Sequence, residues 1–330
     1  MRKSGILLPV SSLPSRYGIG CFSKEAYEWV DFLKLAGQQY WQILPLGPTG
    51  YGDSPYQAFS AFAGQPLLIS PDELIKDGLL YGDDLRNYPH FNPDHIYYGD
   101  VIPAKLRILH RSYEIFKESA DLCMLKEFDV FCEHEKDWLD DYALFMAGKD
   151  AHGGACWLEW EDDLRDPDEE IKAAWRERLA DSIEYYKYIQ FIFFRQWNAI
   201  RDYAHVNGIK IVGDIPIYVA LDSAEVWVYP DLFELDENLV PKAVAGCPPD
   251  AFSPTGQLWG NPLYDWEYHK KTGYSWWMRR IAYCFRLYDI VRIDHFRGFD
   301  EYYAIPYGEK TAVNGKWMPG PGIGFFRAVE

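Results

Sequence analysis

The chain has 330 residues and carries 33 Lys and Arg against 50 Asp and Glu, which gives a formal net charge of −17 at pH 7. Nucleic acids and anionic lipid surfaces attract basic proteins, so this excess of acidic groups argues against a nucleic acid or a membrane as a partner. Hydrophobic residues make up 48% of the chain and charged residues 25%, a balance typical of a folded protein with a core.

The start of the chain predicts two parallel strands joined by a helix. Short apolar runs occupy residues 5–9 (GILLP) and 40–46 (YWQILPL), and each is typical of a strand, the first of them buried. Between them, apolar side chains recur at helical spacing from Ala26 to Leu33, and Gly37 ends the pattern. Two strands joined in this way form a βαβ unit, in which the strands run parallel.

From about residue 70 to about residue 180, charged and helix-favouring stretches replace this pattern. They cover residues 103–118, 121–147 and 168–180, and no strand-like apolar run separates them. We interpret this region as a helical insertion within a single domain.

Two copies of a helix followed by a strand come next. Apolar spacing predicts a helix from about residue 181 to 207, ended by Gly208, and the apolar run IKIVGDIPIYV follows it. A second helix, over about 274–288, leads into DIVRIDHFRGF. The return of strands after helices predicts an α/β fold with a parallel sheet.

Residues 229–265 lie between these two units and are rich in Pro and Gly. A connection of this length in a compact domain is usually a functional lid or a disordered segment. Because the segment contains Phe252 and Trp259, we predict an ordered lid over a site.

Carboxylates follow both of the later strands, at Asp214 and Asp294. Each alone could cap a following helix, but active sites of parallel barrels gather at the carboxyl ends of the strands, so we expect the two to meet. Arg292 shares a strand face with Asp294, and a neighbouring guanidinium keeps a carboxylate ionised. An ionised, oriented carboxylate is suited to attack an anomeric carbon. His295 either binds sugar hydroxyls or is a hydrogen-bonded core histidine.

Aromatic residues make up 17% of the chain, and residues 50–64 (GYGDSPYQAFSAFAG) concentrate them. Rings that also carry a hydrogen-bonding group suit the faces of sugars, although a bulky aromatic core is the alternative. Tyr56, with Asp53 and Gln57 nearby, would form a platform for stacking, unless the loop is simply packed on the rim of the sheet. The facing wall would come from Asp250, Trp259 and Asn261.

The sequence shows no sign of export, of a membrane span or of a common cofactor site. The apolar stretch near the start is short and interrupted by Pro9, and no run of 18 apolar residues occurs. The six cysteines form no CxxC pair, and HExxH, Walker A and GxSxG motifs are absent. We expect a soluble, cytoplasmic protein with reduced thiols.

Five motifs in this order resemble one family. They are LPSRYGIG at 13–20, GDSPYQ at 52–57, GDIPIYVA at 213–220, PPDAFSPTGQLWGNPLY at 248–264 and RIDHFRGF at 292–299. Together they are similar to the 4-α-glucanotransferases, the amylomaltases or disproportionating enzymes of glycoside hydrolase family 77. The resemblance implies an α/β fold, a (β/α)8 TIM barrel with helical insertions, and no cofactor. It also implies transfer of α-1,4-glucan segments between maltooligosaccharides, or starch or glycogen chains, with retention.

The resemblance also assigns roles to individual residues. Asp294 matches the nucleophile, Arg292 the residue that orients it, Asp214 a sugar-binding carboxylate, and Tyr56 a ring near the bond to be cleaved. Positions of a second glucan groove match Tyr51 and Tyr98. The lid over the acceptor side matches Asp250, Phe252, Trp259 and Asn261. The lid departs from the family at Ala251, where a bulkier residue is expected.

The second catalytic carboxyl group of the family has no match in the chain. A retaining mechanism needs it about 5 Å from the nucleophile, first as acid and then as base. The family places this Glu in an A-E-D-L-G type motif, which the sequence lacks. We therefore expect a C-terminally truncated sequence, in which residues 1–330 form one incomplete catalytic domain with only the N-terminal part of the barrel. We also expect this chain alone to be poorly stable and inactive.

Two other functions stay open at this point. One is a non-catalytic glucan-binding remnant, although such a protein would not need Arg292, Asp294 and Asp214. The other is an α-glucan hydrolase with the same barrel and nucleophile. Its products would be shorter glucans only, whereas a transferase also makes longer ones.

Overall fold

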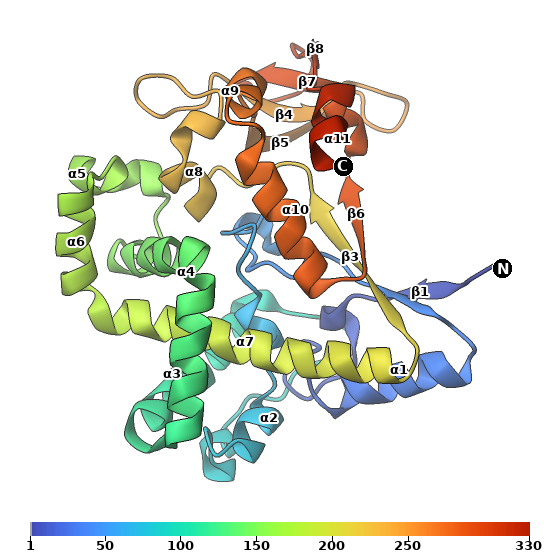
Figure 1. Ribbon diagram of the computed structural model, residues 1–330, viewed down its shortest axis with the longest axis vertical. Helices are drawn as coiled ribbons and strands as arrows, with labels where there is room; N and C mark the ends of the chain where they lie inside the picture. Colours follow the sequence, from blue (N-terminus) through green and yellow to red (C-terminus); the bar gives the residue numbers. More distant parts are fainter. Residues whose placement is uncertain (1) are drawn as a thin grey trace.

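The computed structural model describes residues 2–330, without the side chains of Tyr51 and Asp162 (Figure 1). The strands are β1 (Gly5–Leu7), β2 (Tyr40–Gln42), β3 (Lys210–Pro216), β4 (Ala243–Cys247), β5 (Gln257–Pro262), β6 (Ile290–Asp294), β7 (Glu301–Pro306) and β8 (Lys316–Pro319). The helices are α1 (Lys24–Leu35), α2 (Pro71–Lys76), α3 (Tyr98–Ser119), α4 (Leu122–Ala151), α5 (Asp162–Arg165), α6 (Glu169–Arg178), α7 (Ala180–Val206), α8 (Ala224–Val228), α9 (Trp266–Lys271), α10 (Ser275–Leu287) and α11 (Ile323–Val329). Short 3₁₀ helices cover Val10–Ser12, Tyr51–Asp53, Pro66–Leu68, Gly82–Leu85, Trp157–Glu159, Pro230–Leu232 and Phe296–Phe299.

Four strands form a parallel sheet in the order β1-β2-β3-β6. All three neighbouring pairs are parallel, with Trp41 opposite Ile211 and Val212 opposite Ile290. The βαβ unit predicted at the start of the chain is therefore confirmed. The two later helix–strand units are confirmed as well, because α7 leads into β3 and α10 leads into β6.

The prediction of a buried strand at residues 5–9 is wrong. β1 is only three residues long, and the side chain of Leu7 is 52% exposed. The reason is its position: β1 lies at one edge of the sheet and β6 at the other, where Ile290 is 41% exposed. An apolar run indicates a strand, but whether that strand is buried depends on which layers cover it.

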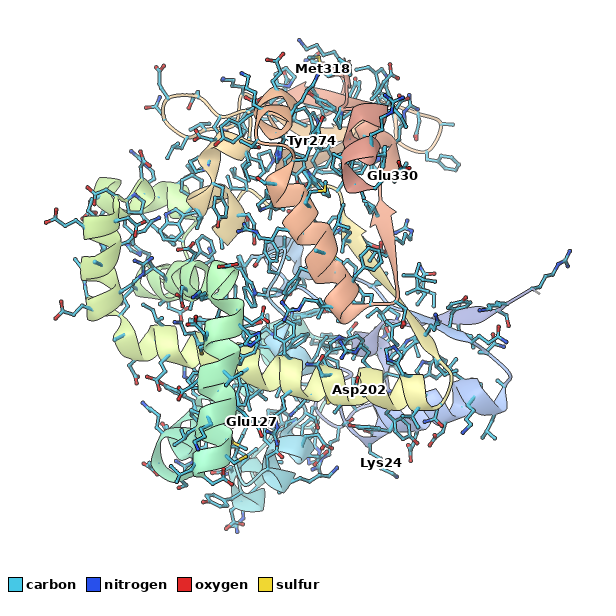
Figure 2. The ribbon with its side chains drawn as sticks, in the orientation of Figure 1. Lys24, Glu127, Asp202, Tyr274, Met318 and Glu330 are labelled. Carbon is cyan, nitrogen blue, oxygen red and sulfur yellow. The ribbon has the colours of Figure 1, made fainter. Side chains whose placement is uncertain are left out.

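Helices α2 to α6 fill the chain between β2 and β3, where the described residues form no strand. The predicted helices of this region are present, and α7 packs against α1, α3 and α4. Figure 2 shows Glu127 and Asp202 among these helices, whereas Tyr274 and Met318 lie in the part of the molecule that contains β4, β5, β7 and β8.

Most of the tryptophans belong to the hydrophobic core. Of the 13 in the sequence, nine are buried. They are Trp41, Trp138, Trp157, Trp160, Trp175, Trp197, Trp227, Trp276 and Trp277. The high tryptophan content is thus explained mainly by packing in the core, and only the few rings that line a cavity are available to bind a sugar.

A second, antiparallel sheet has the order β5-β4-β7-β8, and β3 and β6 point toward it (Figure 1). Half of it, β4 and β5, comes from residues 229–265, where the sequence analysis expected a lid and did not predict strands. Strands β4 (AVAGC) and β5 (QLWGNP) each contain a glycine and show no regular alternation of apolar and polar residues, so the sequence pattern did not indicate them. Gly246 is required there, because a Cβ at this position would lie 2.1 Å from the backbone oxygen of Gln257. The part without regular structure between β4 and β5 is residues 248–256.

Candidate active site

Strands β3 and β6 place two carboxylates and one guanidinium side by side. In the ladder between them, Asp214 is paired with Arg292 and Pro216 with Asp294. Nη1 of Arg292 donates to Oδ1 and Oδ2 of Asp214 at 2.7 and 2.8 Å, and its Nη2 donates to Oδ1 of Asp294 at 2.6 Å. One guanidinium therefore holds both carboxylates at the carboxyl end of the sheet, where the sequence predicted that they would meet.

The two carboxylates differ in their access to solvent. The side chain of Asp214 is 1% exposed, and that of Asp294 is 40% exposed. Burial raises the pKa of Asp214, while hydrogen bonds from Arg292 and Tyr56 oppose this shift. The hydrogen bond to Asp214 raises the pKa of Arg292, so the guanidinium stays charged. A ligand can thus reach Asp294, whereas both oxygens of Asp214 are buried and already accept hydrogen bonds from Arg292.

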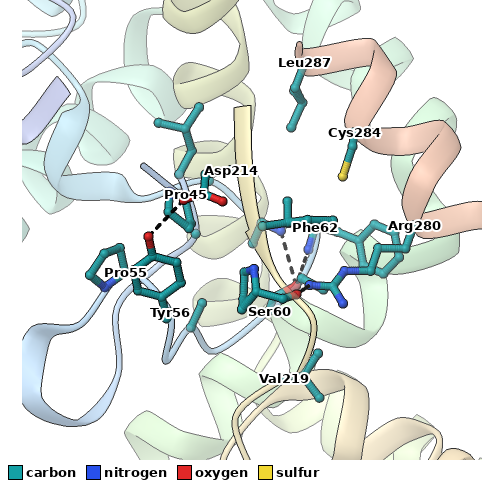
Figure 3. Close-up of a pocket in the computed structure, with 18 of the residues that line it drawn as sticks. Pro45, Pro55, Tyr56, Ser60, Phe62, Asp214, Val219, Arg280, Cys284 and Leu287 are labelled. Atoms are coloured by element: carbon teal, nitrogen blue, oxygen red, sulfur yellow. Dashed lines mark hydrogen bonds between the residues drawn. The ribbon is translucent and has the colours of Figure 1, made fainter. Parts of the chain in front are cut away.

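Tyr56 approaches this group from the segment that follows β2. Its hydroxyl donates to Oδ2 of Asp214 at 2.9 Å (Figure 3). Burial, followed by the hydrogen bond to Asp214, raises the pKa of Tyr56 to about 12, so the phenol remains a donor at neutral pH. The ring of Tyr56 is therefore fixed at one wall of the site by a bond to a buried carboxylate.

A cavity of about 490 Å³ opens beside Asp294. It is lined by Ser54, Tyr56, Gln57, Pro216, Ile217, Tyr218, Gln257, Trp259, Asn261, Asp294 and His295. The lining combines aromatic faces with amide and hydroxyl groups, as expected of a site for a small polar molecule with apolar faces. Asp294 is the only carboxyl group among these lining residues.

His295 has a left-handed backbone with φ of 49°, an uncommon conformation for a residue with a side chain. Its ring meets Trp259 edge to face, with centroids 4.8 Å apart. Burial lowers the pKa of His295, and its Nε2 is buried without a hydrogen-bond partner. Backbone strain of this kind persists where the surroundings enforce it, here directly after Asp294.

Two side-chain amides tie the Tyr56 segment to β5. Nε2 of Gln57 donates to Oδ1 of Asn261 at 2.9 Å and to the backbone oxygen of Trp259 at 3.1 Å. Nδ2 of Asn261 donates to the backbone oxygen of Val219 at 2.8 Å. These bonds fix both walls of the cavity relative to the end of β3.

The structure does not bring every expected site residue to this cavity. Oδ1 of Asp250 accepts from the backbone N–H groups of Phe252 and Ser253 in a turn, and the side chain of Phe252 is 97% exposed. Asp53 lies outside the lining, and Tyr98 lines a separate cavity of about 280 Å³. Tyr51 was also expected here, and its side chain lies outside the description.

The sequence analysis missed several residues that line the cavity. Ser54, Ile217, Tyr218 and Gln257 were not named, although each lies within four positions of a residue that was. A signal was available, because all four belong to motifs already selected. Among the side chains that the structure describes, no group of three or more His, Cys, Asp and Glu could hold a metal ion. None of the described helices combines the length and apolar character of a membrane span.

Four parallel strands, helices that lead into them and a cavity at their carboxyl ends define an α/β protein with its site at that edge of the sheet. The model of the 4-alpha-glucanotransferase family, glycoside hydrolase family 77, matches residues 8–330. The chain belongs to this family.

Individual relatives agree with this assignment. A 4-alpha-glucanotransferase of Clostridium butyricum is 50% identical over 324 residues, which are 97% of this chain and 66% of that protein. One of Synechocystis sp. is 49% identical over 329 residues, 99% of this chain and 65% of that protein. The amylomaltase of Streptococcus agalactiae, solved in complex with acarbose, is 42% identical and superposes with a TM-score of 0.96, over 100% of this chain and 66% of that one. The chain thus spans about two thirds of the length of the relatives it matches.

Proposed function

We propose that the protein transfers α-1,4-glucan segments between maltooligosaccharides, or between starch or glycogen chains, by a retaining double displacement. Asp294 attacks the anomeric carbon of the donor, the bond to the departing oxygen breaks as that oxygen takes a proton from the second carboxyl group that a retaining mechanism requires, and a covalent glycosyl-enzyme forms. A hydroxyl of the acceptor then attacks the same carbon and returns its proton to that second carboxylate, and Asp294 leaves as a carboxylate. The observation that carries the proposal is the exposed carboxylate of Asp294, held by Nη2 of Arg292 at 2.6 Å on the wall of the cavity.

The surrounding residues have separate roles in this proposal. Arg292 orients Asp294 through a hydrogen bond, and Asp214 holds Arg292 in place. Tyr56 offers its ring to a sugar, and Trp259 with His295 forms the opposite wall. The family membership and the names of the relatives support this assignment.

Three further assignments rest on the family resemblance. Residues 248–256, the connection between β4 and β5, would cover the acceptor side, with Phe252 exposed for contact with a glucan. Residues 70–180 would form a helical insertion of the barrel domain. Tyr98, in its own cavity, would belong to a second glucan groove.

The test uses a donor that needs no acid catalyst. A glycosidic oxygen must be protonated as it leaves, whereas fluoride departs without a proton. Among the described side chains that line the cavity, Asp294 is the only one with a carboxyl group. We expect α-maltosyl fluoride to add one maltosyl unit to the 330-residue chain, detected by intact mass. Removal of the adduct by water also needs a base, so the adduct should accumulate.

Matched variants make this test specific. The variant Asp294→Asn should form no adduct, whereas Asp231→Asn, a change at an exposed carboxylate that does not line the cavity, should react like the wild type. An unmodified wild-type chain, or a modified Asp294→Asn chain, would contradict the proposal.

A cytoplasmic location is part of the same proposal. All six cysteines are free thiols, as expected in a reducing compartment. Starch, glycogen and maltooligosaccharides would be the partners of the protein there.

A further inference from the structure

At the position paired with Asp294, the end of β3 has no backbone N–H group to donate a hydrogen bond. Pro216 is paired with Asp294 in the ladder, and proline has no N–H to donate to a neighbouring strand. Pro216 and the following Ile217 also line the cavity that Asp294 faces. The backbone beside the exposed carboxylate therefore needs another source of rigidity.

Arg280 supplies hydrogen bonds to this backbone from helix α10. Its Nη2 donates to the carbonyl of Pro216 at 2.6 Å, and its Nη1 donates to the carbonyl of Ile217 at 3.0 Å. The hydroxyl of Tyr264 donates to the same carbonyl of Ile217 at 2.8 Å. Two consecutive carbonyls at the exit of β3 are thus held by side chains from two other segments. Figure 3 shows the side chain of Arg280 extending from α10 toward this region.

Burial of the Arg280 guanidinium removes a charge from water, a cost that packing alone does not explain. The residue is 2% exposed, and among the described side chains the carboxylate that interacts with it is that of the buried Glu225, through a long-range electrostatic interaction without a salt bridge. Its guanidinium lies over the rings of Trp276 and Trp277, at 5.4 and 4.9 Å from their centroids. An apolar residue could fill this space without the desolvation of a charge, but it could not bind two carbonyls.

The position of Arg280 connects it to the reacting group through a short chain of contacts. A small cavity of about 50 Å³ is lined by Arg280 together with Tyr56, Asp214 and Pro216, directly behind the wall of the larger cavity. Asp214 lies two residues before Pro216 on β3, and it holds Arg292, which in turn holds Asp294. A shift at the end of β3 would therefore displace both the cavity wall and the support of the nucleophile.

We propose that Arg280 is a positioning residue, which fixes the exit of β3 and thereby the aim of Asp294 at the donor sugar. This inference rests on the function proposed above. It predicts that loss of Arg280 slows the covalent step far more than it weakens binding, because misplacement of reacting atoms by about 1 Å can cost on the order of 100-fold in rate.

The experiment measures the glycosylation of the chain by α-maltosyl fluoride under single-turnover conditions in wild type, Arg280→Lys, Arg280→Met and Arg279→Met. Saturation with donor separates the dissociation constant from the maximal rate. Arg279 is the matched control, since its guanidinium lies over the rings of Phe62 and Tyr229 and makes no bond to the β3 exit. Amide hydrogen exchange over residues 214–220 reports the backbone directly and does not depend on any activity.

For Arg280→Met we expect a maximal rate lower by about 10- to 100-fold, a donor dissociation constant changed less than about 3-fold, and faster exchange at residues 217–220. Lysine keeps the charge and can donate hydrogen bonds but lacks the rigid planar fork of arginine, so the values for Arg280→Lys should fall between those of Arg280→Met and the wild type. Arg279→Met should match the wild type in all three measurements.

An unchanged maximal rate per folded molecule in Arg280→Met, even with a lower melting temperature, would overturn the inference and leave Arg280 a structural residue. Equal rate losses in Arg279→Met and Arg280→Met would overturn it too. The failure of the proposed function gives a different result: the wild-type chain itself would then not react, whatever the exchange at residues 217–220 shows.

Discussion

Arg292 contacts Asp214 through a single nitrogen, Nη1, which donates to both oxygens of the carboxylate at 2.7 and 2.8 Å. The other nitrogen, Nη2, is left for Asp294. Because the side chain of Asp214 is 1% exposed and that of Asp294 is 40% exposed, the buried carboxylate is the anchor and the exposed one is the reactive member. The family resemblance assigned sugar binding to Asp214, and the observed bonds favour an indirect role.

The variant Asp214→Asn separates these two roles. The amide removes the charge that holds Arg292, so we expect the rate of adduct formation with α-maltosyl fluoride to fall by about 100-fold. Binding of maltooligosaccharides, measured by calorimetry, should change little, because Asp214 does not line the larger cavity. A large loss of binding at an unchanged rate per bound donor would instead show direct contact with the sugar.

The variant Tyr56→Phe removes one hydrogen bond and keeps the ring. The lost bond to a charged carboxylate is worth about 1.5–3 kcal/mol at most, so we expect a rate of adduct formation lower by about 10-fold. Glucan binding should persist, because the face of the ring remains. The pKa of Tyr56 is raised to about 12, so its hydroxyl stays protonated from pH 6 to pH 9. The ratio of the rates of adduct formation in the wild type and in Tyr56→Phe should therefore be constant over this range. The variant Tyr56→Ala should weaken glucan binding as well, and equal binding by Ala and Phe variants would exclude stacking.

The sequence predicted the parallel sheet and the meeting of Asp214, Arg292 and Asp294 because these depend on local signals. An apolar run followed by a charged residue marks the end of a strand, and the parallel order of strands brings those ends together. The alternation of side chains along β6 then sets Arg292 beside Asp294.

Other features could not be predicted in this way, because they depend on contacts distant in sequence. The antiparallel sheet pairs β4 with β7, about 60 residues later, and neither strand specifies its partner or its register by itself. The bonds from Gln57 to Asn261 and from Arg280 to Pro216 join segments with no common motif. The exposure of Leu7 depends on the layer that covers the sheet, which the run GILLP does not specify.

Acid should destabilise the protein through His269. This side chain is fully buried among the rings of Tyr264, Trp266 and Trp276, and burial lowers its pKa to about 4. An unfolded histidine titrates near 6.5, so the folded state disfavours the proton. The stabilisation from neutral His269 is therefore complete above pH 6.5 and is lost as the pH falls from 6.5 toward 4.

Urea unfolding at pH 7 and pH 5 measures this effect. We expect the free energy of unfolding to fall by about 2 kcal/mol more in the wild type than in His269→Phe, which cannot take up a proton. His134→Phe is the control, because His134 lies on helix α4 away from this cluster. An equal pH dependence in wild type and His269→Phe would show that His269 does not control acid stability.

The stereochemistry of the reaction follows from the position of Asp294 and can be tested without a second carboxyl group. On the cavity wall only Asp294 carries a carboxyl, so we expect the 330-residue chain to consume α-maltosyl fluoride but to leave maltotriose unchanged. Azide is a nucleophile that needs no base, and it should release the glycosyl-enzyme as a maltosyl azide. Because each displacement inverts the anomeric carbon, two displacements should give the α-azide, which proton NMR distinguishes from the β-azide. A β-azide would mean direct displacement without a covalent intermediate. Conversion of maltotriose into glucose and longer glucans would mean that the chain supplies its own acid and base.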